Sequence, residues 1–256
     1  DTDEIVRVCR AASELGISKI KLTGGEPLVR RICIPLVKEL KALPGISQVT
    51  LTTNGILLAE QLPELMEAGL DAVNISLDTL AAETFERITR RSALPQVLQG
   101  LEKALSYPSL KVKVNCVPTF QPEADLIQIA GLARENLLHV RFIEMMPIGL
   151  GKEFTARGEE QIKVVLERAY GSMTPTGERL GNGPCHYYEV PGFKGKIGFI
   201  SAMTHKFCSQ CNRVRLTAEG YLKGCLQFQK GRDLRELLRG GGSDEELTET
   251  IADVIW

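Results

Sequence analysis

The sequence predicts an α/β protein built on a parallel sheet that curves into an open, partial (β/α) barrel. Short β-rich runs alternate with amphipathic helical segments, and the loops between them are short. Repeated βα units of this kind imply parallel strands joined by right-handed crossovers. Polar residues follow the apolar part of each run, and polar groups at the carboxyl ends of strands are typical of the active-site rim of a barrel. Five such runs are too few to close a barrel, so we expect an open one.

The first predicted element is a helix. Asp1-Thr2-Asp3-Glu4 resembles a helix N-terminus, and apolar residues follow at helical spacing as far as Gly16. Five predicted strands follow, at residues 20–23, 49–53, 72–77, 112–117 and 140–143. The polar groups at their carboxyl ends are Thr23-Gly24-Gly25-Glu26, Thr52-Thr53-Asn54-Gly55, Ser76-Leu77-Asp78, Asn115 and Glu144.

The pattern changes after Pro147, so we divide the chain into a barrel core at residues 1–147 and a C-terminal region at residues 148–256. Within the second region, one helix is predicted at residues 161–170, and residues 174–184 are rich in Gly, Pro and Thr, as loops are. Two short runs, residues 187–190 and 196–200, predict a β-hairpin. A final helical segment is predicted at residues 244–255.

Composition excludes several classes of protein. The chain has 256 residues, 43% of them apolar and 25% charged, as in ordinary soluble globular proteins. A net charge of −1 provides no general attraction for nucleic acid or an anionic membrane, and no apolar stretch approaches the ~18 residues that a membrane helix needs. Seven cysteines without disulfide-like spacing indicate a reducing compartment. We therefore expect a cytoplasmic protein that binds neither nucleic acid nor membrane.

Three cysteines near the C-terminus predict a metal site. Cys208 and Cys211 are separated by two residues, and Cys225 follows after a gap of thirteen. Such thiolates can occupy three corners of one ion or cluster, which leaves the fourth ligand open. His205 could complete a Cys3His zinc site, or the three thiolates could hold a [4Fe–4S] cluster whose fourth iron binds a substrate atom. Spacing alone favours structural zinc, because closed sites of this kind are common.

A pair of glycines follows the first predicted strand. Gly24 and Gly25 would let the backbone approach a ligand closely, and the Glu26 carboxylate suits an ammonium group. A simple turn with a capping acid is the alternative.

One predicted strand carries cations on a single face. Lys111, Lys113 and Asn115 alternate with valines, so the polar side chains share one face of the strand. An inward-facing cation is costly unless an anion meets it, whereas a solvated edge strand is the plainer alternative. The cations that we place near a phosphate-bearing ligand are Lys21, Lys113, Arg141, Arg213 and Arg215.

Five motifs taken together resemble one family. Gly24-Gly25-Glu26-Pro27, Thr52-Thr53-Asn54-Gly55, Ser76-Leu77-Asp78, Arg141-Phe-Ile-Glu-Met-Met146 and Cys208-x2-Cys211-Asn-Arg-x-Arg215 occur in the order found in MoaA-type GTP 3′,8-cyclases, which are radical S-adenosylmethionine (SAM) enzymes. The resemblance covers nearly the whole chain, and the cysteine motif is its most specific part. It implies a partial, open TIM-like (β/α)6 barrel of the radical SAM type, with a small C-terminal cluster-binding region.

The resemblance also implies an activity and its residues. The activity is that of a lyase converting GTP to 3′,8-cyclo-7,8-dihydro-GTP, the first step of molybdenum cofactor biosynthesis. No catalytic residue is assigned, and Lys21 stands where the family usually has Arg, which keeps the charge but loses the planar fork. The implied sites are Gly25, Glu26, Ser76 and Met146 for SAM, Lys21, Thr52, Lys113, Arg141, Arg213 and Arg215 for GTP, and Cys208, Cys211 and Cys225 for a [4Fe–4S] cluster whose open iron meets guanine.

The sequence departs from the family at both ends. The family's first strand and its Cys-x3-Cys-x2-Cys loop, which holds a second, SAM-cleaving [4Fe–4S] cluster, are absent, as is its Gly-Gly tail. We therefore expect a fragment, or the ordered part, of a longer protein, unable to perform the reaction alone. In the intact protein, reductive cleavage of SAM would give a radical that removes hydrogen from the ribose C3′ of GTP, and the carbon radical would attack C8 of guanine.

The resemblance implies GTP, an external reductant, the next enzyme of the pathway and a homodimeric partner. Two other functions stay open from the residues. One is another radical SAM enzyme with an auxiliary cluster, such as a peptide-modifying one. The other is a zinc-stapled nucleotide-binding module closed by His205.

Overall fold

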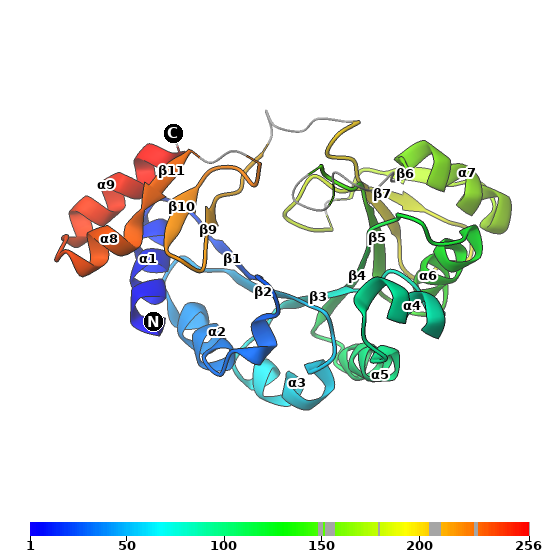
Figure 1. Cartoon of the computed structure of the whole chain (residues 1–256), viewed down its shortest axis with the longest axis horizontal. Helices are drawn as coiled ribbons and strands as arrows, with labels where there is room; N and C mark the ends of the chain where they lie inside the picture. Colours follow the sequence, from blue (N-terminus) through cyan, green and yellow to red (C-terminus); the bar gives the residue numbers. More distant parts are fainter. Residues whose placement is uncertain (148–150, 152–156, 179, 205–210, 228–229, 256) are drawn as a thin grey trace. The chain divides into compact units, whose positions relative to one another are not determined.

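The protein is described by a computed structural model that covers residues 1–147, 151, 157–178, 180–204, 211–227 and 230–255 (Figure 1). The chain forms two compact units, and neither is one continuous stretch of sequence. The first unit comprises Asp1–Leu51, Pro63–Asp71 and Asn212–Trp256, and the second comprises Thr52–Leu62 and Ala72–Cys211. Among the residues just given, no helix has the length and apolar character needed to cross a membrane.

The N-terminal part of the first unit begins with the predicted helix. In α1, the Asp1 carboxylate accepts a hydrogen bond from the Glu4 amide at 2.9 Å, which caps the helix. Strands β1 and β2 pair in parallel, as the βα pattern predicted. Both β2 and the helix that follows it continue into the second unit. The elements are α1 (Thr2–Glu14), β1 (Lys19–Leu22), the 3-10 helix η1 (Pro27–Val29), α2 (Cys33–Ala42), β2 (Gln48–Thr53) and α3 (Leu58–Glu67).

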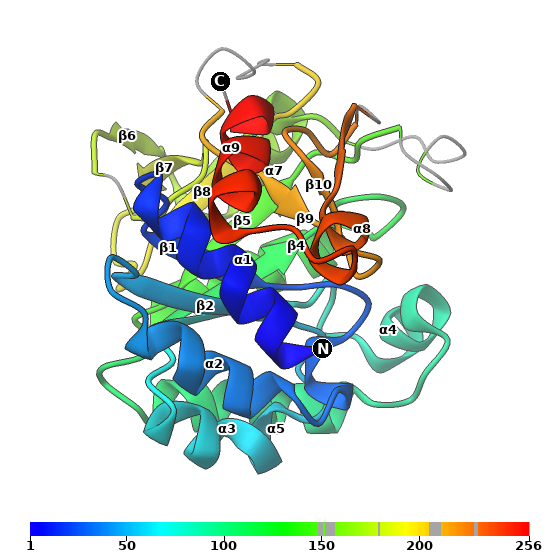
Figure 2. The same ribbon diagram turned by 90° about the vertical axis from the view of Figure 1, so that its left-hand side faces the viewer.

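The C-terminal part of the first unit returns to pack on α1. Its three short strands form an antiparallel sheet in the order β11-β10-β9. Helix α9 has the predicted bounds, and Figure 2 shows it beside α1. The elements are β9 (Arg215–Leu216), β10 (Tyr221–Lys223), β11 (Gly231–Asp233), α8 (Leu234–Arg239) and α9 (Asp244–Ile255).

Apolar burial and flanking ion pairs join α1 to these elements. Val8 of α1 and Ile251 of α9 are buried in one cluster with Leu222 of β10. Arg7 Nε lies 2.5 Å from Asp244 Oδ1 at the edge of this cluster. Burial of a side chain of this size stabilises a fold by roughly 1.5–3 kcal/mol, whereas an exposed ion pair contributes roughly 0–1 kcal/mol. The apolar cluster therefore provides most of the attraction between α1 and α9.

The second unit contains a mixed sheet in the order β3-β4-β5-β8-β7-β6. Strands β3, β4, β5 and β8 are parallel, and β7 is antiparallel to both β8 and β6. The elements are β3 (Ala72–Ser76), α4 (Ala82–Thr89), α5 (Leu94–Leu105), β4 (Lys111–Cys116), α6 (Glu123–Glu135), β5 (His139–Ile143), α7 (Glu159–Tyr170), β6 (Thr174–Thr176), β7 (His186–Glu189) and β8 (Ile197–Ile200).

The predicted hairpin is confirmed as β7 and β8, but the strands have further neighbours. Strand β8 also pairs in parallel with β5, so this hairpin extends the sheet of the preceding βα units. Strand β6 lies in the segment expected to be a loop. It pairs with β7 at the edge of the sheet, where Pro175 is tolerated because an edge strand can lack one amide donor.

One face of this sheet is apolar and is covered by helices. Val112 and Val114 of β4, Phe142 of β5 and Phe199 of β8 are all less than 5% exposed, and the two phenylalanine rings stack with centroids 5.8 Å apart. Helix α6 packs on β5 and on α7, and Figure 1 shows both helices on one side of the strands. Because side chains alternate along a strand, the opposite face receives the polar residues.

Candidate functional site

The polar side chains of the second unit line up across its strands. Lys113 of β4 is in register with Asn74 of β3 and His139 of β5, and Asn115 is in register with Arg141. Register partners in neighbouring strands project to the same face of a sheet. Gly198 of β8 is the partner of Arg141 on one side and of a tyrosine of β7 on the other. We call the resulting set the cationic face; it comprises Asn74, Lys113, Asn115, His139, Arg141 and Tyr187.

Arg141 is held in place by two asparagine side chains. Its Nε and Nη2 donate to Asn115 Oδ1 at 2.9 and 2.6 Å, and Nη2 also donates to Asn74 Oδ1 at 2.6 Å. Asn74 in turn donates from Nδ2 to Thr52 Oγ1 at 3.2 Å. Arg141 is only 8% exposed, and these acceptors are neutral amides. The geometry therefore fixes the guanidinium without neutralising its charge.

Lys113 adds a second cation to the same face. It is 7% exposed, and its ammonium donates to the carbonyl oxygen of Leu180. The valines on either side of it face the apolar core, so the predicted division of this strand into a polar and an apolar face is confirmed. Strand β4 lies between β3 and β5, which is incompatible with the alternative of a solvated edge strand.

The protonation of His139 is affected by burial and by the positive charges nearby. Burial and the nearby charges of Lys113, Lys196 and Arg141 lower the pKa of His139 to about 4. Its Nδ1 accepts a hydrogen bond from the Lys196 amide at 3.2 Å, which requires an unprotonated nitrogen at that position. At neutral pH the imidazole is therefore uncharged and adds no third cation to the face.

The Gly24-Gly25-Glu26 turn belongs to the first unit. Gly24 has a φ of +149°, which disfavours other residues, and a Cβ added at Gly25 would meet nothing within 4 Å. The backbone at Gly25 is thus open to close approach. Glu26 Oε1 accepts from the Leu28 amide at 3.0 Å and caps η1, so the capping alternative describes one role of this carboxylate. Contact of Gly25 and Glu26 with SAM stays a prediction.

The other predicted ligand-binding residues divide between the two units. Thr52, Lys113 and Arg141 belong to the second unit, where Asn74 links Thr52 to Arg141 by hydrogen bonds and is the register partner of Lys113. In the same unit, Ser76 is exposed at the carboxyl end of β3, and Met146 is half-buried just after β5. Lys21, Arg213 and Arg215 belong to the first unit, where Lys21 and Arg213 are exposed and Arg215 is half-buried at the start of β9.

The cysteines are of two kinds. Cys9, Cys33 and Cys116 are buried, as expected of small apolar side chains, and burial raises the pKa of each thiol, to about 11 for Cys9. Cys211 is exposed and Cys225 is half-buried. The Gln227 amide donates to Cys225 Sγ at 3.4 Å, a contact that stabilises a thiolate. Cys208 and His205 lie outside the described residues.

Accessible thiols suit the chemistry of metal ligation, because the thiolate is the metal-binding form and burial without a charge partner opposes it. Cys211 and Cys225 therefore fit a ligand role, and the buried cysteines do not. Over the part of the chain that the structure describes, no group of three His, Cys, Asp or Glu side chains is arranged to bind a metal ion.

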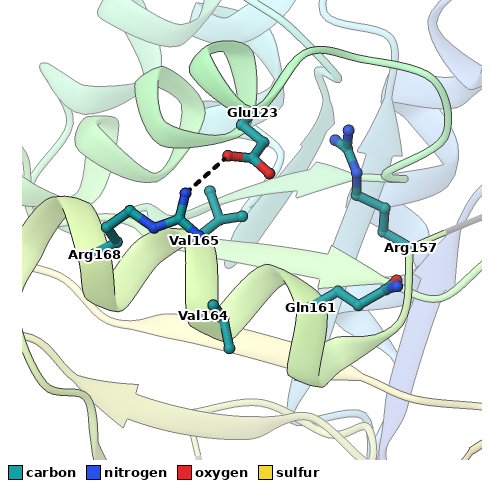
Figure 3. Close-up of a pocket in the computed structure, with 6 residues that line it drawn as sticks. All are labelled: Glu123, Arg157, Gln161, Val164, Val165 and Arg168. Carbon is teal, nitrogen blue, oxygen red and sulfur yellow. Dashed lines mark ion pairs between the residues drawn. The ribbon is translucent and has the colours of Figure 1, made fainter.

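A separate hollow lies between α6 and α7 (Figure 3). Arg168 Nη1 lies 3.5 Å from Glu123 Oε2 across it, and both side chains are at least half exposed. Arg157 Nη1 donates to the carbonyl oxygen of Gln121 at 2.6 Å. None of the residues assigned from the sequence lines this hollow, so it is not part of the candidate site.

Sequence reasoning missed Asn74, His139 and Tyr187. The alternation along residues 72–76 places Asn74 on the same face as Ser76, and this signal was sufficient to find it. His139 is the first residue of β5, one position before the strand predicted at residues 140–143, and no local pattern indicated a role for it. Tyr187 could not be found in this way, because its position opposite Gly198 depends on strand pairing that local patterns do not reveal.

Comparisons with known proteins agree with the motifs. The profile of the radical SAM superfamily matches residues 1–133, and the profile described as Molybdenum Cofactor Synthesis C matches residues 138–256. The fold resembles that of SuiB from Streptococcus suis bound to S-adenosylmethionine, with a TM-score of 0.64, 14% identity, and coverage of 98% of this chain and 60% of that one. The predicted fold of the radical SAM type is thus confirmed.

Relatives extend over almost the whole chain. A GTP 3′,8-cyclase from Clostridium perfringens is 45% identical over 255 residues, which are 99% of this chain and 79% of the relative. One from Syntrophomonas wolfei is 46% identical over 259 residues, with 99% and 78% covered. Molybdenum cofactor biosynthesis protein 1 from Dictyostelium discoideum is 40% identical over 257 residues, with 98% and 40% covered. The chain therefore belongs to the GTP 3′,8-cyclase family within the radical SAM superfamily.

Proposed function

We propose that this protein is a GTP 3′,8-cyclase, a lyase that converts GTP to 3′,8-cyclo-7,8-dihydro-GTP in the first step of molybdenum cofactor biosynthesis. The observation that carries the proposal is the buried Arg141 guanidinium, which neutral amides hold in position beside Lys113. Buried charge is expensive unless an opposite charge meets it. A nucleotide triphosphate provides that charge, and the family relationship supports GTP as the nucleotide.

Three residues of the second unit would bind the triphosphate. The Arg141 guanidinium is fixed through Nε and Nη2 by Asn74 and Asn115, so its Nη1 amino group is held in one orientation from which it can donate to the ligand. Lys113 would contribute a point charge. Thr52 would contribute its hydroxyl, which already accepts from Asn74. Lys21, Arg213 and Arg215 complete the proposed set of GTP-binding residues.

The cofactor sites are proposed on the same basis. Gly25, Glu26, Ser76 and Met146 would bind SAM, and the open backbone at Gly25 together with the exposed Ser76 supports this assignment. Cys208, Cys211 and Cys225 would hold a [4Fe–4S] cluster, and the accessible thiols of Cys211 and Cys225 suit that role. When bound, SAM and iron–sulfur clusters supply the carbon-centred radical chemistry from which the superfamily takes its name.

The residues of this chain would act by positioning. Radical transfer requires the reacting carbon to be held at one distance and orientation, and fixed cations on the triphosphate restrict both. The asparagines beside Arg141 would keep its fork from turning when the ligand binds. His139 stays neutral among these cations, so the positive charge that the cationic face presents to the ligand comes from Lys113 and Arg141.

A titration under anaerobic conditions tests the proposal. We expect saturable binding of GTP, weaker binding of GDP and much weaker binding of guanosine, because the cations of the cationic face contact phosphate. In a turnover assay with SAM and a reductant, a family member that carries the Cys-x3-Cys-x2-Cys loop is expected to give a product that is isomeric with GTP and separable from it by chromatography, whereas this chain alone is expected to give none. Equal affinity for GTP and guanosine would contradict the assigned role of Lys113 and Arg141.

The remaining partners are proposals as well. A homodimer, an external reductant and the next enzyme of the pathway are proposed from the family. A cytoplasmic location is proposed because the seven cysteines lack the spacing typical of disulfide-bonded proteins, as expected in a reducing compartment.

A further inference from the structure

The hydroxyl group of Tyr187 is buried and makes no hydrogen bond to the residues that the structure describes. Among the described residues, no atom meets hydrogen-bond geometry with Tyr187 Oη, although the side chain is only 4% exposed. Buried hydroxyls in folded proteins are nearly always paired, because an unpaired one retains the cost of losing its water. Cys185 and Arg141 lie near enough to affect the pKa of this hydroxyl, but neither meets hydrogen-bond geometry with it, so among the described residues the group is available to a further partner.

Two glycines direct the Tyr187 side chain towards the cations of the cationic face. A Cβ added at Gly198 would lie 2.8 Å from Tyr187 Cε1, so only a glycine in β8 leaves room for this ring between β7 and β5. Gly198 is also the register partner of Arg141. A Cβ added at Gly181 would lie 2.9 Å from Lys113 Nζ and 3.9 Å from Tyr187 Oη, so the ammonium and the hydroxyl border the same glycine.

The charge state of these groups defines what they can bind. Burial raises the pKa of Tyr187, although the charge of Arg141 opposes the rise, so the hydroxyl is protonated at neutral pH and can donate. Arg141 and Lys113 can only donate. Three donors on one face of the sheet, two of them cationic, are suited to an oxyanion with several acceptor oxygens, such as a phosphate group.

We propose that Tyr187 is a ligand-binding residue of the cationic face, whose hydroxyl donates a hydrogen bond to a phosphate oxygen of the nucleotide held by Lys113 and Arg141. This inference rests on the proposed function for the identity of the nucleotide. It adds a neutral donor that neither the motifs nor the cation pattern of the sequence indicated. The Tyr187 ring makes an edge-on contact with His139, at 5.6 Å between centroids, which restricts the orientation of the ring on this face.

The next residue provides a matched control. Tyr188 lies on the opposite face of β7, packs edge-on against Phe199, and its hydroxyl is 3.3 Å from Glu159 Oε1. Tyr187→Phe keeps the ring and removes an oxygen that makes no hydrogen bond to the described residues, whereas Tyr188→Phe removes a hydroxyl that is paired with Glu159. The two variants are chemically identical changes at adjacent positions.

The test is titration calorimetry of the anaerobically prepared protein with GTP, inorganic triphosphate and guanosine, together with thermal unfolding. For Tyr187→Phe we expect the Kd of GTP and of inorganic triphosphate to rise about 10- to 100-fold, as for loss of a hydrogen bond to a charged group. The Tm should be unchanged or higher. For Tyr188→Phe the Kd values should be unchanged and the Tm lower.

Several results would overturn the inference. If the wild type binds GTP and Tyr187→Phe binds it equally well, Tyr187 does not contact phosphate. If the wild type binds inorganic triphosphate but not GTP, the proposed function fails, while a weaker affinity of Tyr187→Phe for triphosphate still supports the inference. If neither ligand binds, both are wrong. Should Tyr187→Phe fail to fold, the 13Cζ resonance of Tyr187 in the wild type decides, because it should shift on adding triphosphate and an unchanged resonance would refute the contact.

Discussion

Replacing Arg141 by lysine separates the charge of this residue from its fork. Arg141→Lys keeps one positive charge but removes a planar group that donates three hydrogen bonds of 2.6–2.9 Å to Asn115 and Asn74. A lysine ammonium is a single point on a flexible stem and cannot reproduce a fork held by two acceptors. The variant therefore tests whether geometry, and not charge alone, makes this a nucleotide site.

The structure sets the size of the expected effects. Asn74 is 4% exposed, so losing the Arg141 donor leaves its amide oxygen with little access to water, and we expect the free energy of unfolding to fall by about 1–3 kcal/mol. On the ligand side, the loss of one charge-assisted hydrogen bond to phosphate is worth about 1.5–3 kcal/mol, so the Kd of GTP should rise about 10- to 100-fold.

Two measurements on the same samples provide the answer: urea unfolding followed by circular dichroism, and calorimetric titration with GTP. Arg134→Lys is the matched control, because Arg134 is an exposed arginine of α6 whose Nε lies 3.6 Å from Glu135 Oε1, and exposed pairs contribute little. The control should change neither quantity. Wild-type affinity for GTP in Arg141→Lys would refute the reasoning, because it would show that GTP binding does not need the guanidinium geometry of Arg141.

Three further predictions follow from the charges of both units. Because burial and neighbouring cations hold the pKa of His139 near 4, below its unfolded value of about 6.5, the stability it contributes is lost as the pH falls from about 6.5 to 4, and His139→Gln should flatten the pH dependence of urea unfolding in that window. Burial raises the pKa of Asp78 to about 6, so its ionisation destabilises the fold as the pH rises above 3.8; Asp78→Asn, which keeps an acceptor for the Val117 amide, should raise the unfolding free energy at pH 7 and leave it unchanged below pH 3.8. Arg213→Ala and Arg215→Ala should each weaken GTP binding in calorimetric titrations, and unchanged affinity would show that these arginines serve only the fold.

Local patterns predicted the elements well where one periodicity dominated. The alternation from Lys111 to Asn115 predicted both the strand and its polar face, and the helical segment predicted at residues 244–255 is observed as α9 with the same bounds. The packing of that helix on α1 could not be predicted, because it joins residues separated by more than two hundred positions through apolar burial that has no local signal. Strand β6 was missed because Pro175 reads as a loop residue, and only its place at the sheet edge allows it.

In the candidate site too, features with a local sequence signal were predicted, and features that depend on strand pairing were not. Arg141 was found by its motif, but its two asparagine partners were not predicted, because they depend on the register between β3, β4 and β5. Tyr187 required a further step, since the room for its ring comes from a glycine on a different strand. For the cysteine motif, spacing alone favoured zinc, and only the resemblance of the whole chain to a family changed the expectation to an iron–sulfur cluster.

The central claim is that this chain binds GTP beside an iron–sulfur cluster with an open iron. Purification without oxygen, followed by measurement of iron, zinc and sulfide and by electron paramagnetic resonance of the reduced protein with and without GTP, tests it most directly. The account predicts about four irons per chain, as in a single [4Fe–4S] cluster, and a spectrum that changes when GTP is added. Stoichiometric zinc without iron after attempted reconstitution, or an iron spectrum that GTP leaves unchanged, would contradict it.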